Sequence, residues 1–437
     1  MNPEQQAGRQ PSPFTPGFNQ TPALLVGRDE ILDAGDEALA TAAEDGRTPT
    51  PLLIVGARGV GKTVLLAEVA SRAGQRYGWP RLHVEMSPGA PFTPTMLAAC
   101  DDVATRFETT PRRQRMRRSE TVVRAQIAGV GGEVHFTPAP SVAPDASEAL
   151  RLALRELMAA SVDAGAGVVV TLDEMQCAQR GELADLVAVL QEGTGAGWPL
   201  VVVGAGLADM RRPDRTVSYL ERADWYEIGA LSPAETADAL QVPAARAGRP
   251  FDADALEYLV TQTGGYPFAV QVFGHHAWRA SSGQPRITLD AARSGATAAT
   301  RRLAQGLYTS RWQQCSPKER EYLTAAALLA REGTITGRVV ADRLGLRVHQ
   351  VSYLRDALIK NGTLLALDNE LRFAVPGMAE WIRENHTPPR LAHESAGSAS
   401  GVPPAQQPRE RSGPCQRPEG QRPQQPRRGR PGPSLGR

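Results

Sequence analysis

The segment Gly56–Thr63 constrains the fold of this 437-residue chain more than any other. It reads Gly-Ala-Arg-Gly-Val-Gly-Lys-Thr and fits G-x-x-x-x-G-K-[ST], with the apolar run Leu52–Val55 before it and a helical pattern, Thr63–Ala73, after it. Glycines let such a loop curl so that backbone N–H groups face phosphate oxygens, and the positive end of the following helix faces the same anion. The segment therefore predicts a phosphate-binding loop between a buried strand and a helix.

The side chains of this loop have distinct expected roles. Lys62 would reach the β and γ phosphates, and the Thr63 hydroxyl would ligate Mg²⁺. Lysine is rare in the chain, with only Lys62, Lys318 and Lys360 beside 46 arginines, so a lysine here indicates that a compact point charge is needed. A glycine-rich turn without a ligand is the alternative. The predicted nucleotide-binding positions are Gly56, Ala57, Arg58, Gly59, Val60, Gly61, Lys62, Thr63 and Val64.

A pair of acidic residues supplies the second part of a nucleotide site. The apolar run Val168–Leu172 reads as a buried strand and ends in Asp173 and Glu174, about 110 residues after the loop. Asp173 would hold Mg²⁺, directly or through water, and Glu174 would orient and deprotonate the attacking water as general base. No Asn-Lys-x-Asp segment occurs, so adenine is favoured over guanine. The two motifs together predict a magnesium-dependent ATPase.

Apolar runs alternate with amphipathic stretches between two polar ends of the chain. This alternation predicts an α/β fold, a P-loop NTPase parallel sheet with helices on both faces, followed by a helical lid and a winged-helix domain. Within the sheet domain, residues 109–140 read as an inserted basic loop and β-hairpin. The expected division is a disordered N-terminus (1–20), the P-loop domain (21–227), the lid (228–311), a winged helix-turn-helix (312–386) and a disordered Pro/Arg/Gln-rich tail (387–437).

Charge and composition exclude several other classes of protein. The net charge is +2, and the tail from Thr387 carries nine arginines against three glutamates, so the body is slightly acidic and is not a globally basic nucleic-acid binder. The four cysteines lie far apart without disulfide or metal-site spacing. The apolar runs are far shorter than the roughly 20 residues of a membrane helix, and the N-terminus does not read as a secretory signal. We expect a soluble, cytoplasmic protein that does not contact membranes.

With these two motifs the chain resembles AAA+ ATPases of the origin-recognition/STAND type, the group that carries a C-terminal winged helix. The resemblance covers roughly Leu24–Asn385 and begins at Leu25–Glu30, similar to the family segment that lies against adenine. It implies a nucleotide contact for Arg28; an ordinary helix start with acidic residues in its first turn is the alternative. Gly264–Pro267 looks like the Gly-x-Pro turn of the lid in STAND switches, which implies that Pro267 packs near the base.

Two segments bear on turnover and assembly. After the strand Leu200–Val203, where the family often places a polar sensor for the γ-phosphate, this chain reads Gly204–Gly206, which favours slow hydrolysis. The segment 219–222 resembles the one that carries the arginine finger. The resemblance implies a homo-oligomer in which Arg222 contacts the nucleotide of a neighbouring subunit; a surface salt bridge is the alternative.

The region Pro317–Asn385 reads as three helices, a two-stranded wing and a last helix, the outline of a winged helix-turn-helix. Its third helix offers Arg347 and Arg355 to DNA, but packing against the nucleotide domain or a protein partner is the alternative. We therefore expect an ATP-binding, slowly hydrolysing switch that couples nucleotide state to rearrangement of lid and winged helix. The alternatives are an ATP-dependent DNA-binding regulator and a nucleotide-binding adaptor without turnover.

Overall fold

The computed structural model describes residues 10–17, 20–107, 146–211, 220–367 and 370–386. The predicted insertion at 109–140 and the predicted tail at 387–437 lie outside these ranges. No helix within the described ranges is both long and apolar enough to cross a lipid bilayer.

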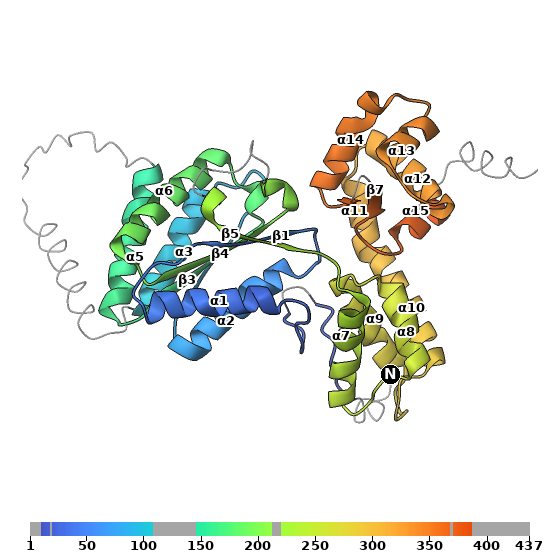
Figure 1. Ribbon diagram of the computed structural model, residues 1–437, viewed down its shortest axis with the longest axis horizontal. Helices are drawn as coiled ribbons and strands as arrows, with labels where there is room; N and C mark the ends of the chain where they lie inside the picture. Colours follow the sequence, from blue (N-terminus) through green and yellow to red (C-terminus); the bar gives the residue numbers. More distant parts are fainter. Residues whose placement is uncertain (1–9, 18–19, 108–145, 212–219, 368–369, 387–437) are drawn as a thin grey trace, which may run out of the picture. The chain divides into compact units, whose positions relative to one another are not determined.

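A five-stranded parallel sheet forms the centre of the N-terminal domain (Figure 1). Its strand order is β2-β3-β4-β1-β5, so chain neighbours are separated by crossovers. Every residue of β1, β3 and β4 is buried, which explains their continuous apolar runs. The strands are β1 (Leu52–Gly56), β2 (Arg81–Glu85), β3 (Val168–Asp173), β4 (Leu200–Gly206) and β5 (Asp224–Ile228).

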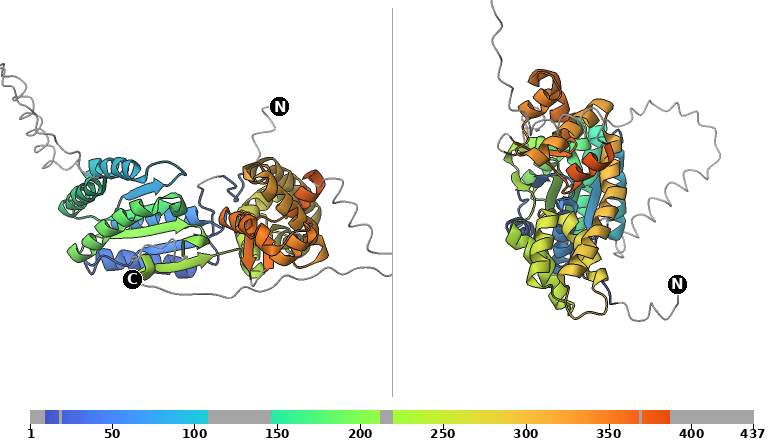
Figure 2. Two further views of the ribbon diagram at one scale, coloured as in Figure 1. Left: turned by 90° about the horizontal axis from the view of Figure 1, so that it is seen from above. Right: turned by 90° about the vertical axis from the view of Figure 1, so that its right-hand side faces the viewer.

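Helices cover both faces of this sheet, as the alternating pattern predicted (Figures 1 and 2). Successive strand residues point to opposite faces, so Ile54 packs with Leu66 in one apolar core and Leu53 packs with Leu186 in the other. The P-loop-type α/β sheet was therefore predicted correctly. One face carries α1 (Asp29–Ala43) and α2 (Lys62–Tyr77), and the other carries α3 (Phe92–Phe107), α5 (Ala146–Asp163) and α6 (Arg180–Ala196).

The region after β5 is helical. Ser232 and Glu235 form a capping box that starts the first of these helices, with a proline at its first turn. A π-helical segment, Ala304–Tyr308, leads into the short helix α11 (Thr309–Gln314). The four helices before it pack together (Figure 2): α7 (Pro233–Arg246), α8 (Ala253–Thr263), α9 (Pro267–Ala280) and α10 (Leu289–Leu303).

The C-terminal region follows the predicted order of elements. The helices α12 and α14 contribute buried residues such as Leu323 and Leu358 to one core, and β6 pairs antiparallel with β7. Ile335 forms an isolated bridge to Leu371 of β7. Its assignment as a winged helix stays a prediction. The elements are α12 (Pro317–Glu332), α13 (Gly337–Arg343), α14 (Val348–Lys360), β6 (Leu364–Leu367), β7 (Glu370–Phe373) and α15 (Met378–His386).

Residues 10–17 correct the expectation that the first twenty residues are disordered. Phe14 is only 2% exposed and packs against α9 at Gly274, where an added Cβ would lie 2.6 Å from the phenyl ring. The Thr15 amide donates to Oε1 of Gln271 at 3.0 Å. The segment has few apolar residues, but one aromatic ring that fits beside a glycine, together with polar contacts, is enough to order it.

Candidate nucleotide-binding site

The phosphate loop connects the carboxyl end of β1 to the start of α2. Gly59 and Gly61 have φ angles of 82° and 101°, which favour glycine. Gly56 has no space for a side chain, because a Cβ there would lie 2.2 Å from the carbonyl oxygen of Ile228. Gly61 caps α2 without a side-chain hydrogen bond, so the first N–H groups of the helix are left for an anion. Val60 is buried and anchors the loop.

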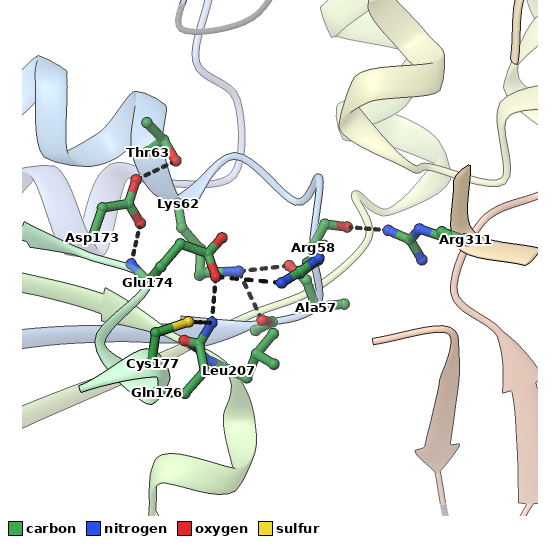
Figure 3. A network of polar contacts seen from close by, with 11 residues as sticks. Ala57, Arg58, Lys62, Thr63, Asp173, Glu174, Gln176, Cys177, Leu207 and Arg311 are labelled. Carbon is green, nitrogen blue, oxygen red and sulfur yellow. Dashed lines mark hydrogen bonds and ion pairs between the residues drawn. The ribbon is translucent and has the colours of Figure 1, made fainter. Parts of the chain in front are cut away.

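Lys62 is a buried cation held by the loop itself (Figure 3). Its Nζ donates to the carbonyl oxygens of Gly56 at 2.9 Å and Ala57 at 2.8 Å. Burial lowers the pKa of Lys62 to about 8, although the carboxylates of Glu174 and Asp173 raise it. Lys62 forms no salt bridge with any described residue, and a buried ammonium group of this kind fits a site that receives phosphate.

Thr63 and Asp173 are brought together at the ends of α2 and β3. The Thr63 hydroxyl donates to Oδ2 of Asp173 at 2.6 Å, while Oδ1 accepts the backbone amide of Glu174 at 2.8 Å. Asp173 is only 3% exposed. Mg²⁺ is commonly held by one or two such oxygens together with substrate phosphates, so this pair fits the predicted metal ligands. Val64, also predicted to bind nucleotide, lies half-buried in the first turn of α2.

Glu174 has a strained backbone and an engaged carboxylate. Its φ of 53° is the only positive φ of a non-glycine residue in the described ranges; such strain costs about 1–3 kcal/mol and is common at functional sites. Oε2 accepts a hydrogen bond from Nε2 of Gln176 and lies 3.8 Å from a guanidinium nitrogen of Arg58 (Figure 3). Gln176 in turn accepts the Leu207 amide at 3.1 Å. Gln176 was not among the predicted site residues, although it lies two residues after the predicted base.

The carboxyl end of β4 has no room for a sensor side chain. A Cβ at Gly204 would lie 2.3 Å from the Met175 sulfur, and one at Gly206 would lie 2.1 Å from the Met210 sulfur. The methionines occupy the space that a polar side chain would need, so a side chain at either glycine requires them to move.

Arg28, the residue just before α1, contacts the phosphate loop. Its guanidinium donates to the carbonyl oxygens of Gly229 at 2.8 Å and Val60 at 3.4 Å. Burial lowers the pKa of Arg28, while Glu235 acts in the opposite direction. The side chain thus links the phosphate loop to the segment between β5 and α7, and its contact with adenine stays a prediction.

A tyrosine just before α9, which was not among the predicted site residues, contacts the phosphate loop. Pro267 is the first residue of α9 and is half-buried, and Tyr266 precedes it. The Tyr266 hydroxyl donates to the carbonyl oxygen of Arg58 at 2.7 Å, and a Cβ on Gly59 would lie 1.9 Å from that hydroxyl. A tyrosine inside the Gly264–Pro267 turn was the available signal.

Arg222 lies away from the phosphate loop of its own chain. It ends a short 3-10 turn just before β5 and is exposed. In the parallel register, Asp224 pairs with Leu52 at the start of β1, whereas the loop follows Gly56 at its end. A rise of roughly 3.3 Å per residue places these two ends more than about 10 Å apart. Arg222 therefore lies near the amino-terminal end of the strands, whereas the loop lies at their carboxyl end.

The parallel sheet, the glycine loop around Lys62 and the Thr63–Asp173 pair define the class of P-loop NTPases. Residues 24–203 match the family model described as AAA ATPase domain. Residues 305–382 match the model of a domain of unknown function (DUF8462). No curated protein sequence matches the chain.

Two solved structures resemble the chain over most of its length. The Walker-type ATPase PABY2304 of Pyrococcus abyssi is 17% identical with a TM-score of 0.56, covering 82% of this chain and 96% of that one. The ORC2 protein of Aeropyrum pernix, solved in ADPNP and ADP complexes, is 16% identical with a TM-score of 0.54, covering 87% and 98%. At these identities the likeness shows the fold alone.

Proposed function

We propose that the chain binds Mg-ATP at the loop Gly56–Thr63 and hydrolyses it slowly, as a molecular switch of the STAND type. The observation that carries the proposal is the buried Lys62 ammonium beside the Thr63–Asp173 pair. Arg58 supports it, because its Nε is buried without a hydrogen-bond partner in the described part of the chain. Buried donors and a helix start that converge on one loop suit a polyphosphate.

In this proposal each residue contributes a defined step. Loop N–H groups and Lys62 bind and orient the phosphates, and Thr63 and Asp173 hold Mg²⁺. When bound, that ion polarises the phosphoryl oxygens. Glu174 accepts the proton of the attacking water once its carboxylate leaves Arg58 and Gln176. The apolar end of β4 supports slow turnover, and the contact of Tyr266 with the loop supports a lid that responds to the nucleotide.

Calorimetry with Mg-ATP on the full chain tests nucleotide binding. Lys62→Ala removes the buried cation, and we expect affinity to fall by about 100-fold, as for loss of two charge-assisted hydrogen bonds. Lys360→Ala is the matched control, because this exposed lysine lies on α14, outside the proposed site. No heat from folded wild-type protein, or unchanged affinity in Lys62→Ala, would reject the proposal. Single-turnover hydrolysis then separates a switch from an adaptor that only holds ATP.

We also propose that Arg222 acts on the nucleotide of a second copy of the chain. The β1–β5 register supports this, because Arg222 lies at the end of the strands opposite to the end that carries its own loop. In a mixture, Lys62→Ala protomers can supply Arg222 while Arg222→Ala protomers bind ATP. ATPase activity that returns only on mixing is expected. Arg211→Ala alone keeps both residues and serves as the control that should stay active, and an Arg222→Ala variant with full activity alone would dismiss the role.

DNA binding is the second candidate function, favoured by one feature of the C-terminal region. Residues 345–350 comprise the turn before α14 and the first residues of that helix. All of them are exposed, and Arg347 lies among them. Arg355 is less available, because it is paired with Asp356 at 2.8 Å. Duplex DNA binding that weakens with salt and drops about tenfold in Arg347→Ala is expected. Absence of binding at low salt removes this candidate and leaves a protein partner for the surface.

A further inference from the structure

Arg311 lies inside the region 305–382 that matches the domain of unknown function, and it contacts the phosphate loop. It lies on α11 and is only 7% exposed. Nη1 donates to the carbonyl oxygen of Gly362 at 2.6 Å, and Nη2 donates to that of Arg58 at 3.5 Å (Figure 3). Gly362 follows α14 and lies 51 residues after Arg311, so one guanidinium group contacts both the phosphate loop and this turn.

The contact around Arg311 is closely packed. The carbonyl of Arg58 also accepts the Tyr266 hydroxyl, so both of its lone pairs are used. A Cβ on Gly362 would lie 3.6 Å from the Arg58 amide nitrogen. Lid, loop and C-terminal region therefore meet at a single peptide of the phosphate loop.

Cations outnumber carboxylates around this contact, because Arg311, Arg58 and Lys62 face only Asp173 and Glu174 among the described residues. Within the described ranges Arg311 has no carboxylate partner, and its hydrogen-bond acceptors are backbone carbonyls and Tyr266. Burial lowers the pKa of Arg311, and the nearby Arg58 lowers it further. Arg311 and Arg58 also act to lower the pKa of Lys62. Buried cations are costly unless an anion compensates them, and a nucleotide's phosphates would supply that anion.

We propose that Arg311 is a positioning residue that couples phosphate occupancy to the region 305–382. Negative charge in the loop offsets the repulsion among Arg311, Arg58 and Lys62, so nucleotide binding strengthens the Arg58–Arg311–Gly362 contact. Loss of phosphate weakens the same contact and releases the turn at Gly362. This inference rests on the proposed nucleotide binding and adds its route to the C-terminal region.

Hydrogen exchange of the full chain, measured with and without Mg-ATP and Mg-ADP, tests this coupling. In the wild type we expect Mg-ATP to slow exchange around Gly362 by about tenfold, the effect of one charge-assisted hydrogen bond. In Arg311→Gln the slowing is lost while nucleotide still binds, with affinity reduced by about tenfold. Arg320→Gln is the matched control, because Arg320 donates to the Trp312 and Gln313 carbonyls and not to the loop.

Two outcomes separate a failure of this inference from a failure of the proposed function. Full protection around Gly362 in folded Arg311→Gln overturns the inference while nucleotide binding stands. No heat and no protection with either nucleotide in the wild type overturns the proposed function as well. If Arg311→Gln does not fold, Arg311→Lys replaces it, since an ammonium group keeps the charge but lacks the fork that reaches two carbonyls. Loss of nucleotide-dependent protection in that variant is again the expected result.

Discussion

The carboxyl ends of neighbouring strands in this sheet are built for different tasks. At β1 and β3 the chain gathers Lys62, Thr63, Asp173 and Glu174 within hydrogen-bonding reach of one another or of the loop. At β4, between them in the sheet, two glycines are covered by methionine sulfurs. The first arrangement suits holding a charged ligand, whereas the residues of β4 itself carry no polar side chain. The difference predicts that mutations can separate nucleotide binding from turnover.

The largest expected effect comes from Glu174→Gln. The amide cannot take a proton from water, so single-turnover hydrolysis should fall by about 10²- to 10⁴-fold. Mg-ATP affinity should stay within about threefold, because no phosphate-binding donor is removed. Quenched-flow assays and calorimetry measure the two effects, with exposed Glu221→Gln as control. Equal turnover in Glu174→Gln and wild type would show that the charged residues at the ends of β1 and β3 bind nucleotide without contributing a general base.

Gly204→Ala tests the apolar end of β4. Its Cβ would lie 2.3 Å from the Met175 sulfur and 2.6 Å from a Leu53 methyl carbon, so overpacking should cost about 1–3 kcal/mol of stability. Thermal unfolding measures the loss. Gly195→Ala on α6 is the control, since no atom lies within 4 Å of its added Cβ and alanine favours the helix. A stable Gly204→Ala variant would mean that this strand end can accept a side chain.

The smallest expected effect belongs to Gln176→Leu. This change removes the side chain that joins Glu174, after β3, to Leu207, after β4. The Leu207 amide loses its acceptor, and stability should fall by about 1 kcal/mol. The Glu174 carboxylate loses a donor, so single-turnover hydrolysis should rise by about two- to fivefold, the effect of a hydrogen bond below 1 kcal/mol. A fall in turnover as deep as that of Glu174→Gln would instead show that Gln176 orients the water.

The sequence alone predicted the elements that carry strong local patterns. Buried strands such as β4 read as apolar runs, although the predicted strand Leu200–Val203 stops three residues before the observed end at Gly206, and the loop at Lys62 follows from glycine spacing. β5 was missed, because Asp224–Ile228 is an edge strand in which only Ile228 is buried. An edge strand pairs on one side only and tolerates polar residues, so its pattern is weak.

The missed site residues depend on contacts between distant parts of the chain. Tyr266 meets Arg58 across 208 positions, and Arg311 meets it across 253. No local period or spacing encodes such a pairing, because it follows from how the lid and α11 pack. The same holds for Phe14, whose polar surroundings gave no sign of a buried ring.

The position of Phe14 beside Gly274 has a consequence for biosynthesis. Thr15 and its partner Gln271 are 256 positions apart, so the N-terminal segment leaves the ribosome long before the surface that receives it. At about 5–20 residues per second, the aromatic ring waits on the order of 10–50 s in solvent. During that interval a chaperone or a second nascent chain can compete for it, because α9, which receives the ring, has not yet been synthesised.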